Sequence, residues 1–486
     1  MTDQLSQLQP AQLWRHFEAL NAVPRASKKE ARVIEFIRNF AEDLRLPCSV
    51  DDAGNVLVKK PATAGMEHRE TIVLQSHLDM VHQKNADTAF DFSTQGISMF
   101  VEGDWVKATG TTLGADNGIG VASIMTVLES TDIPHPAIEA LFTIDEETGM
   151  TGALSFKGDL LSAGILLNLD TEEDNELTIG CAGGIDVTAS GTYTAIVSEN
   201  ELKCTIALKG LTGGHSGVDI HKGRANANKL LTRILLHVAK EFSADLIAFD
   251  GGSLRNAIPR EAVAELMIRV SDEENLRASV KSLEMVLKSE YGFTDPQLNV
   301  AFETSADKEM VMPKAHQAAL LRVLHTCPNG IHRMSPDIDG LVQSSNNIAR
   351  VMIKNGEWSV QCLTRSSVDS EKMDLAAAIG SAFELANGTI SVGGVYPGWT
   401  PRPEAPIVQL MSDLYKELFN EPAHVNAVHA GLECGILGTH YPDMQMISFG
   451  PNIYGAHSPD EKVQISSVQK FWKFFLQTLK RIPEKK

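Results

Sequence analysis

The first third of the chain has two kinds of hydrophobic pattern. Residues 11–46 carry apolar side chains at helical spacing, interrupted at Pro24, which predicts two helices. Farther on, short apolar runs predict strands at 55–60, 71–77, 138–145 and 164–170, and helical patterns predict helices at 117–130 and 151–160. Because these strands alternate with helices, we expect a mainly parallel sheet with helices on both faces.

Near residue 185 the pattern changes to long, alternating, threonine-rich runs, which are typical of antiparallel strands with one solvated face. Two rounds of helix and strand follow, the first at 223–242, 261–270, 274–290 and 296–305, the second at 314–326, 358–367, 369–387 and 389–397. The rounds share a layout without obvious sequence identity, so a duplicated unit is one alternative. The last predicted elements are a helix at 407–419, a strand at 444–450 and a helix at 466–482.

These patterns predict an α/β protein of two domains. The first, formed by residues 1–185 and 396–486, has a mainly parallel sheet flanked by helices and carries the chemistry. The second, residues 186–395, is an inserted α+β lid that binds substrate, and it is the domain that the duplication would concern.

Composition narrows the classes of partner. The 486 residues include 62 acidic and 43 basic side chains, a formal net charge of −19. Such a surface repels phosphate backbones and anionic lipid, so we expect neither nucleic acid nor membrane as a partner. The six cysteines form no C-x-x-C pair, and the N-terminal residues lack the pattern of a secretory signal. We therefore expect a cytoplasmic protein with reduced cysteines.

Polar residues that suit chemistry follow several of the apolar runs. In "TIVLQSHLDMV", a predicted core strand ends at His77 and Asp79. The other candidates are Asp116 at a glycine-rich turn before a helix, Glu146 and Glu147 after the strand 138–145, Asp170 at the end of 164–170, and His457 in the loop after 444–450. Each alone has a plain structural alternative, such as a helix cap or a turn. Together they would meet beyond the carboxyl ends of parallel strands.

A crevice with several unpaired carboxylates repels itself unless a divalent cation keeps the group ionised. Two imidazoles with carboxylates and no thiolate favour zinc, with cobalt or manganese as substitutes. Three carboxylates and two histidines can hold two ions when one carboxylate bridges them. Asp79 would orient His77 through the other ring nitrogen. Glu146 is then the spare acid and the natural general base.

Five motifs in this order, "SHLDMV", "LGADNGIG", "DEETGM", "NLD" and "GAHSPDE", resemble the metal-site motifs of the M20 family of co-catalytic zinc peptidases. The resemblance implies two zinc ions per chain and a homodimer. It also implies the ligands: His77 and Asp170 on one ion, Glu147 and His457 on the other, and Asp116 as the bridge. Family members tend to have a cis peptide bond after the bridging aspartate, here between Asp116 and Asn117. Aspartate at position 170 resembles the aminopeptidase and dipeptidase branches.

The lid supplies further candidates. By the same resemblance, His215 in "LTGGHSGVD" stabilises the oxyanion, and Asn256 in "GGSLRNAIPRE" contacts substrate. Arg365 in "QCLTRSSVD" suits a bidentate grip on a C-terminal carboxylate, although an ordinary salt bridge is nearly as good an interpretation. Outside the lid, in residues 396–486, "VHAGLECG" presents His429 and Glu433, and Glu433 is a candidate contact for the substrate's free amino group.

The resulting functional hypothesis is metal-dependent hydrolysis of dipeptides with free termini, Xaa-His among them. Water activated between two zinc ions would attack, with Glu146 as general base and then general acid. One alternative is an N-acyl amino acid amidohydrolase or carboxypeptidase on the same scaffold. The other is a metal- or peptide-binding protein without turnover.

Overall fold

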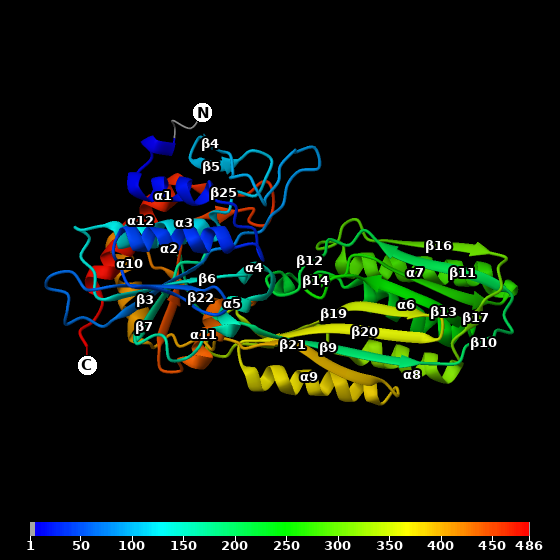
Figure 1. Cartoon of the computed structure of the whole chain (residues 1–486). Helices are drawn as coiled ribbons and strands as arrows, with labels where there is room; N and C mark the ends of the chain where they lie inside the picture. Colours follow the sequence, from blue (N-terminus) through cyan, green and yellow to red (C-terminus); the bar gives the residue numbers. More distant parts are fainter. Residues whose placement is uncertain (1–4, 486) are drawn as a thin grey trace. The chain divides into compact units, whose positions relative to one another are not determined.

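The computed structural model describes residues 5–485, and the chain forms two compact units (Figure 1). Unit 1 comprises Met1–Gly180, Trp399–Ala427 and Leu432–Lys486, and unit 2 comprises Cys181–Gly398 and Val428–Gly431. The predicted α/β class is confirmed. Unit 1 contains segments from both ends of the chain.

An eight-stranded sheet lies at the centre of unit 1. Its order is β1-β2-β6-β3-β7-β23-β8-β22. The bounds are β1 Cys48–Val50, β2 Val56–Lys60, β3 Ile72–His77, β6 Ile138–Thr143, β7 Ile165–Asn168, β8 Glu176–Cys181, β22 His424–Val428 and β23 Gln445–Ser448. The four central strands, β6, β3, β7 and β23, run parallel, whereas β1, β2 and β8 pair antiparallel with their neighbours. Strands β3, β6 and β7 are buried throughout, including polar positions such as Gln75 and Glu139. Their mainly apolar sequences suit strands that are covered on both faces.

Helices cover this sheet (Figure 1). They are α1 Ala11–Asn21, α2 Ala31–Asp43, α3 Ala115–Glu129, α4 Glu146–Gly149, α5 Thr151–Ser155, α10 Pro406–Phe419, α11 Glu433–His440 and α12 Ile465–Arg481, with a short 3-10 turn at Leu5–Gln7. Helix α3 is buried on nearly all sides, which explains its almost uniformly apolar sequence. The helix predicted at 151–160 ends at Ser155, so that prediction was too long.

A second, four-stranded sheet in unit 1 has the order β24-β25-β5-β4. Its strands are β4 Met99–Glu102, β5 Trp105–Ala108, β24 Ile453–Tyr454 and β25 Lys462–Gln464. They have only two to four residues each, too few for a periodic pattern, so the sequence did not predict them.

Unit 2 contains two halves of the same topology. The first consists of β11 Leu202–Lys209, α6 Ala227–Phe242, β13 Asp245–Gly252, β15 Ala262–Ile268, α7 Glu273–Tyr291 and β16 Asn299–Ser305. The second consists of β9 Gly183–Thr192, α8 Lys314–Thr326, β19 Val342–Lys354, β20 Glu357–Ser366, α9 Asp369–Glu384 and β21 Thr389–Tyr396. Their strand orders, β16-β11-β15-β13 and β21-β9-β20-β19, correspond one to one. Unit 2 is therefore a topological duplication, with the first half inserted after β9.

The two halves join where β13 pairs antiparallel with β19, which makes one continuous sheet (Figure 1). Smaller elements complete unit 2: β18 Gly330–Met334 pairs with β19, β10 Ile196–Val197 with β17 Met310–Val311, and β12 Gly214–His215 with β14 Ala257–Ile258, with 3-10 turns at Ile220–Lys222 and Val270–Asp272. Strand β19 escaped prediction because its first half is polar, "VQSSNN", yet buried.

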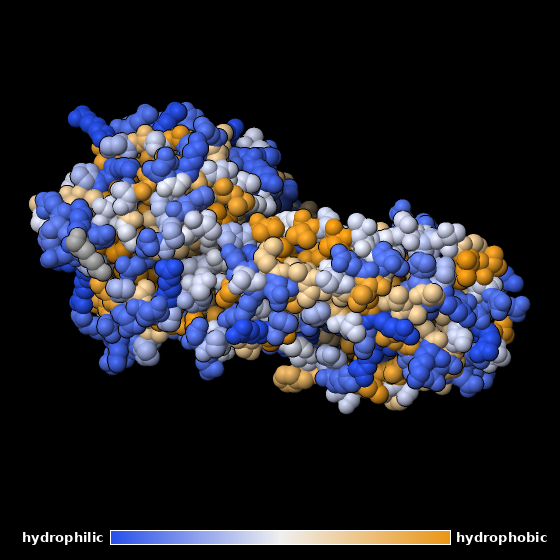
Figure 2. Space-filling view, turned by 90° about the horizontal axis from the view of Figure 1, so that it is seen from below, coloured by the Kyte–Doolittle hydropathy of each residue, from blue (hydrophilic) through white to orange (hydrophobic). Residues whose placement is uncertain are grey.

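Hydrophilic side chains predominate on the face drawn in Figure 2, and apolar ones gather in separate small patches, as the acidic composition leads one to expect. Within residues 5–485, no helix combines the length and apolarity needed to cross a bilayer.

Candidate metal centre

The candidate ligands of unit 1 lie at the carboxyl ends of the four parallel strands. His77 is the last residue of β3. Glu147 lies in α4, directly after β6. Asp170 follows β7, and His457 lies in the loop between β24 and β25. Asp116 lies in the first turn of α3. The fold thus brings together residues that are up to 380 positions apart in the sequence, as His77 and His457 are.

These ligands form two groups of three. In one, Nε2 of His77 lies 3.2 Å from Oδ1 of Asp116 and 3.4 Å from Oδ1 of Asp170. In the other, Nε2 of His457 lies 3.5 Å from Oδ2 of Asp116 and 3.0 Å from Oε2 of Glu147. The ligand atoms of each group lie within 4.8 Å of one another. Asp116 gives one oxygen to each group, which is the geometry that a bridging carboxylate needs.

Asp79 connects two of the loops that carry ligands. Its side chain is fully buried, and its Oδ1 lies 3.4 Å from Nδ1 of His77. The same carboxylate accepts hydrogen bonds from the backbone amides of Glu146, at 3.1 Å, and Glu147, at 3.3 Å. It therefore fixes the ring of His77 and the start of α4 together, which is the orienting role expected of a carboxylate behind a ligand histidine.

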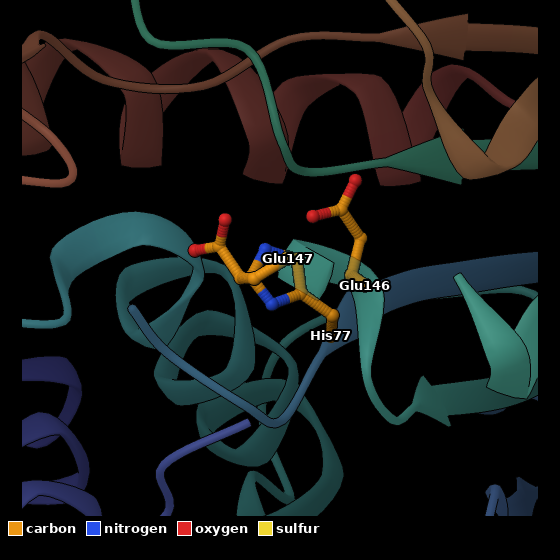
Figure 3. A group of neighbouring side chains, drawn as sticks. All are labelled: His77, Glu146 and Glu147. Atoms are coloured by element: carbon orange, nitrogen blue, oxygen red, sulfur yellow. The ribbon is translucent and has the colours of Figure 1, made fainter. Parts of the chain in front are cut away.

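Glu146 has a raised pKa, in contrast to Asp116, whose pKa is lowered. Figure 3 shows Glu146 and Glu147 reaching past His77 with their carboxyl groups pointing in different directions. Burial raises the pKa of Glu146 well above its usual value, and the carboxylates of Asp170, Glu147 and Glu433 add to the rise, against the opposing effect of His77. A carboxyl group that holds a proton this readily suits proton transfer.

The histidines and carboxylates of the site shift one another's pKa values. Burial lowers the pKa of His77, but the surrounding carboxylates outweigh it and raise that pKa well above its usual value. Hydrogen bonds that the ring of His457 donates to Asp116 and Glu147 raise the pKa of His457 to about 11. Burial alone would raise the pKa of Asp116, yet the bonds with the two histidines lower it. The site is thus a concentrated negative charge that attracts cations.

The segment around Asp116 has the geometry that the resemblance implied. The peptide bond between Asp116 and Asn117 is cis. The side-chain amide of Asn117 donates to Oδ1 of Asp170, so it links the segment of Asp116 to the segment that follows β7. A Cβ at Gly120 would collide with the side chains of Asn117 and Ser76, which explains a glycine one turn into α3.

Sequence reasoning missed two residues that hold the ligand loops. The buried carboxylate of Glu461 accepts hydrogen bonds from four successive amides: Leu113 at 2.7 Å, Gly114 at 2.9 Å, Ala115 at 2.7 Å and Asp116 at 3.3 Å. It lies in the motif "GAHSPDE", four residues after His457, and that position was an available signal.

The second missed residue is Arg25, which is 1% exposed. Its guanidinium donates to the carbonyl oxygens of Leu78 and Asp79, each at 3.1 Å, and to that of Gly114. It thereby joins the loop after β3 to the turn before α3. No motif in the sequence pointed to it.

The predicted lid residues lie in unit 2. His215 in β12 pairs opposite Ala257 in β14, so it lies beside the loop of Asn256, which is exposed. Nδ1 of His215 accepts hydrogen bonds from the amides of Gly217, at 3.2 Å, and Val218, at 3.0 Å. Because an amide can only donate, the ring proton of a neutral His215 is on Nε2, where it can serve as a donor.

Glu433 belongs to unit 1 and is 1% exposed, at the start of α11. Its Oε2 accepts hydrogen bonds from Gln75 and Thr143, each at 2.6 Å, and its Oε1 has no partner within the described residues. Burial raises the pKa of Glu433 to about 8. Its predicted contact with a substrate amino group stays a prediction.

Comparison with known proteins agrees with this description. Residues 206–295 match the M20 peptidase dimerisation domain. The cytosol non-specific dipeptidase of Escherichia coli (strain K12) is 42% identical over 483 residues, which cover 99% of this chain and 100% of that protein. The crystal structure of aminoacylhistidine dipeptidase from Vibrio alginolyticus has a TM-score of 0.92 at 42% identity and full coverage of both chains.

A more distant structure, an M20 family metallo-carboxypeptidase from Sulfolobus solfataricus, has 14% identity and a TM-score of 0.54, over 97% of this chain and 99% of that one, and shares the fold. Fold and site together define a two-unit hydrolase scaffold with a cluster of residues that could hold metal ions. The chain belongs to the M20 family of metallopeptidases.

Proposed function

We propose that this protein is a metallodipeptidase that hydrolyses dipeptides with free termini, Xaa-His among them. The observation that carries the proposal is the pair of ligand groups sharing Asp116, with Glu146 beside them. The full-length similarity to proteins named as dipeptidases supports the substrate class. The name of the Escherichia coli relative also supports a location in the cytosol.

The donor set fits two zinc ions, with cobalt or manganese as substitutes. His77 and Asp170 would hold one ion, Glu147 and His457 the other, and Asp116 would bridge them. The buried Oε1 of Glu147 has no hydrogen-bond partner in the described part of the chain, so it has a lone pair to offer a cation. When bound, such ions supply Lewis acidity at the scissile carbonyl and lower the pKa of water.

The protein's own residues would handle the proton and the developing charge. Glu146 takes a proton from the attacking water and returns it to the leaving amine, a role suited to its raised pKa. Asp79 keeps the ring of His77 and the start of α4 in place. Nε2 of His215 donates to the oxyanion of the tetrahedral intermediate.

Recognition of both ends of the substrate would restrict it to dipeptides. Arg365 receives the C-terminal carboxylate, Asn256 contacts the peptide, and Glu433 is the candidate for the free amino group. Arg365 is 4% exposed and, within the described residues, has no carboxylate at salt-bridge distance, since nearby Asp186 pairs with Arg255 at 3.1 Å. A substrate carboxylate would supply that direct partner.

We also propose a homodimer, which the match to a dimerisation domain supports. Light scattering coupled to size-exclusion chromatography tests it, because a dimer has twice the 52.8 kDa of one chain. A mass of one chain at all concentrations would contradict it.

The functional test uses chelated protein before and after addition of zinc or cobalt. The substrates are Ala-His, N-acetyl-Ala-His and Ala-Ala-His. We expect metal-restored cleavage of Ala-His alone. Cleavage of the acetylated substrate would instead indicate an amidohydrolase or carboxypeptidase, and metal binding without any cleavage would indicate a binding protein.

A further inference from the structure

Unit 2 contains a polar cluster around Arg365 that extends beyond the residues already considered. Nη1 of Arg365 donates to the hydroxyl of Tyr396 at 2.8 Å, while its Nε is buried without a hydrogen-bond partner in the described chain. A buried guanidinium with an unused N–H is costly in free energy unless an anion completes it. The cluster is therefore built to receive a negatively charged group.

The strand register explains how the cluster forms. Arg365 in β20 lies between Ser345 in β19 and Gly184 in β9, which are its partners on the two sides. A Cβ at Gly184 would lie 2.6 Å from Oη of Tyr396. Only glycine at this position lets the tyrosine ring lie over β9 with its hydroxyl against Arg365.

His429 completes the cluster from the short segment Val428–Gly431, which belongs to unit 2. Its ring is 8% exposed, and Nε2 lies 2.7 Å from the hydroxyl of Ser345, the cross-strand neighbour of Arg365. Its Nδ1 is buried and, within residues 5–485, makes no hydrogen bond of normal geometry. Two unused nitrogens, one on Arg365 and one on His429, thus belong to residues joined through Ser345.

Gly217 shows how closely these groups approach. A Cβ at Gly217 would lie 3.1 Å from Nε of Arg365 and 3.1 Å from Cε1 of His215, and it would collide with the carbonyl oxygen of His429. The backbone of the "GGHSG" loop therefore packs directly against His429 and Arg365. Residues from three separate segments of unit 2 converge at this point.

The ring of His429 is neutral at physiological pH. Burial, together with the charge of Arg365 and the neighbouring His215 and His221, lowers its pKa to about 3, against a hydrogen-bond contribution from the backbone of Val342 that raises it. A neutral ring has one N–H and one acceptor nitrogen. If the hydroxyl of Ser345 donates to Nε2, the N–H lies on Nδ1.

We propose that His429 is a specificity residue that donates Nδ1–H to the C-terminal carboxylate of the substrate, beside Arg365, with Ser345 holding the required tautomer. This inference rests on the proposed dipeptidase function. A carboxylate can accept from both donors at once, whereas a C-terminal amide would turn an NH₂ group toward a donor. The pair therefore selects free acids over amides.

The test compares kcat and KM for Ala-His and Ala-His amide on the zinc-loaded enzyme. His429→Phe should lose about 10- to 100-fold of the wild-type preference for the acid, mainly in KM, because a hydrogen bond to a charged group is lost. His429→Asn, which keeps an N–H near the same place, should recover part of it. Ser345→Ala should lose a smaller part.

Ser344→Ala is the matched control. Ser344 is the neighbouring buried serine of β19, and its hydroxyl bonds Ser366 at 2.9 Å and Glu371 at 2.8 Å instead. It should keep the wild-type preference. An unchanged acid-to-amide ratio in His429→Phe would overturn the inference while dipeptide hydrolysis itself stands.

A second measurement decides the question if the His429→Phe variant does not fold or if the wild type shows no cleavage. If His429→Phe does not fold, judged by its thermal melting curve, His429→Asn and Ser345→Ala decide the question. If the wild type cleaves neither substrate, the proposed function fails. The affinities of wild type and variants for the same two peptides, measured by calorimetry, then test the carboxylate contact alone. His429→Phe should lose the preference for the acid over the amide, and an unchanged preference would overturn the inference.

Discussion

At the scale of single residues, the proposed site assigns the holding of a cation and the moving of a proton to different side chains. Asp116 contacts both histidines through different oxygens, and Glu147 and Asp170 contact one each. Within the described chain, Glu146 makes no ion pair of this kind, although it lies within reach of His77. A raised pKa without a fixed partner is what leaves this carboxyl group available for proton transfer.

Replacement of Glu146 by glutamine tests this division. The amide keeps the size of the side chain but cannot take a proton, so kcat for Ala-His should fall by about 100- to 10,000-fold. Zinc content, measured by elemental analysis, should equal that of the wild type. A variant that retains kcat would show that another group is the base.

Glu433 gives a prediction about pH and stability. Its folded-state pKa of about 8 exceeds the usual 4.5, so the folded protein binds the proton more tightly than the unfolded chain does. Stability therefore falls as pH rises from 4.5 through 8, because the buried carboxylate becomes charged. In chelated protein, Glu433→Gln should be more stable than wild type by a few kcal/mol at about pH 9 and nearly equal at about pH 5.

Urea unfolding at the two pH values measures this difference. Glutamine retains an oxygen that can accept from Gln75 and Thr143, so the comparison isolates the charge. A variant less stable than wild type at the higher pH would show that the carboxylate has a favourable partner.

At the scale of elements, loop anchoring decides where the ligands lie. Strands β3, β6, β7 and β23 bring their ends together, but Asp116 reaches the site only because the turn before α3 is held by Glu461. The carboxylate satisfies amides that would otherwise be unpaired at a buried helix start.

Loss of this anchor should weaken metal binding without removing a ligand. We expect Glu461→Ala to reduce zinc affinity about 10- to 100-fold, as changes behind metal ligands commonly do. Asp460→Ala is the control, since Asp460 is the adjacent exposed carboxylate. Competition with a coloured zinc chelator measures both. Equal affinities in the two variants would contradict the anchoring role.

Sequence reasoning succeeded where a pattern was long or a motif was dense. Buried strands such as β3 and β7 could be predicted because each contains an apolar run. The candidate ligands His77 and Asp170 lie at or just after the ends of these strands. It failed where burial is polar: β19 begins with serines and asparagines whose side chains bond residues of β20, and no hydrophobic period marks it. The role of Arg25 could not be predicted either, because it depends on hydrogen bonds to backbone carbonyl oxygens of loops that are distant in the sequence.

At the scale of the whole molecule, the two units differ in what metal should do to them. All predicted metal ligands belong to unit 1, whereas the core of unit 2 is a sheet formed by two similar halves. A cation bound to the folded state stabilises the structure that forms its site. Unit 2 should therefore respond to metal far less than unit 1.

Hydrogen exchange with and without a chelator examines this difference. Zinc should slow exchange at the end of β3 and at the start of α3, by about tenfold or more, because opening those segments releases the ions. Amides of β13 and β15 should exchange at unchanged rates. Equal effects in both units would mean that metal stabilises the chain in some other way.

The most direct test of the account measures bound zinc and Ala-His turnover on the same samples of wild type and Asp116→Ala. We predict two zinc ions per chain with turnover in the wild type, and loss of both ions and of turnover in the variant, because each group of ligands uses one oxygen of Asp116. A variant that keeps two ions and hydrolyses Ala-His would contradict the shared-carboxylate centre, as would full turnover by the chelated wild type.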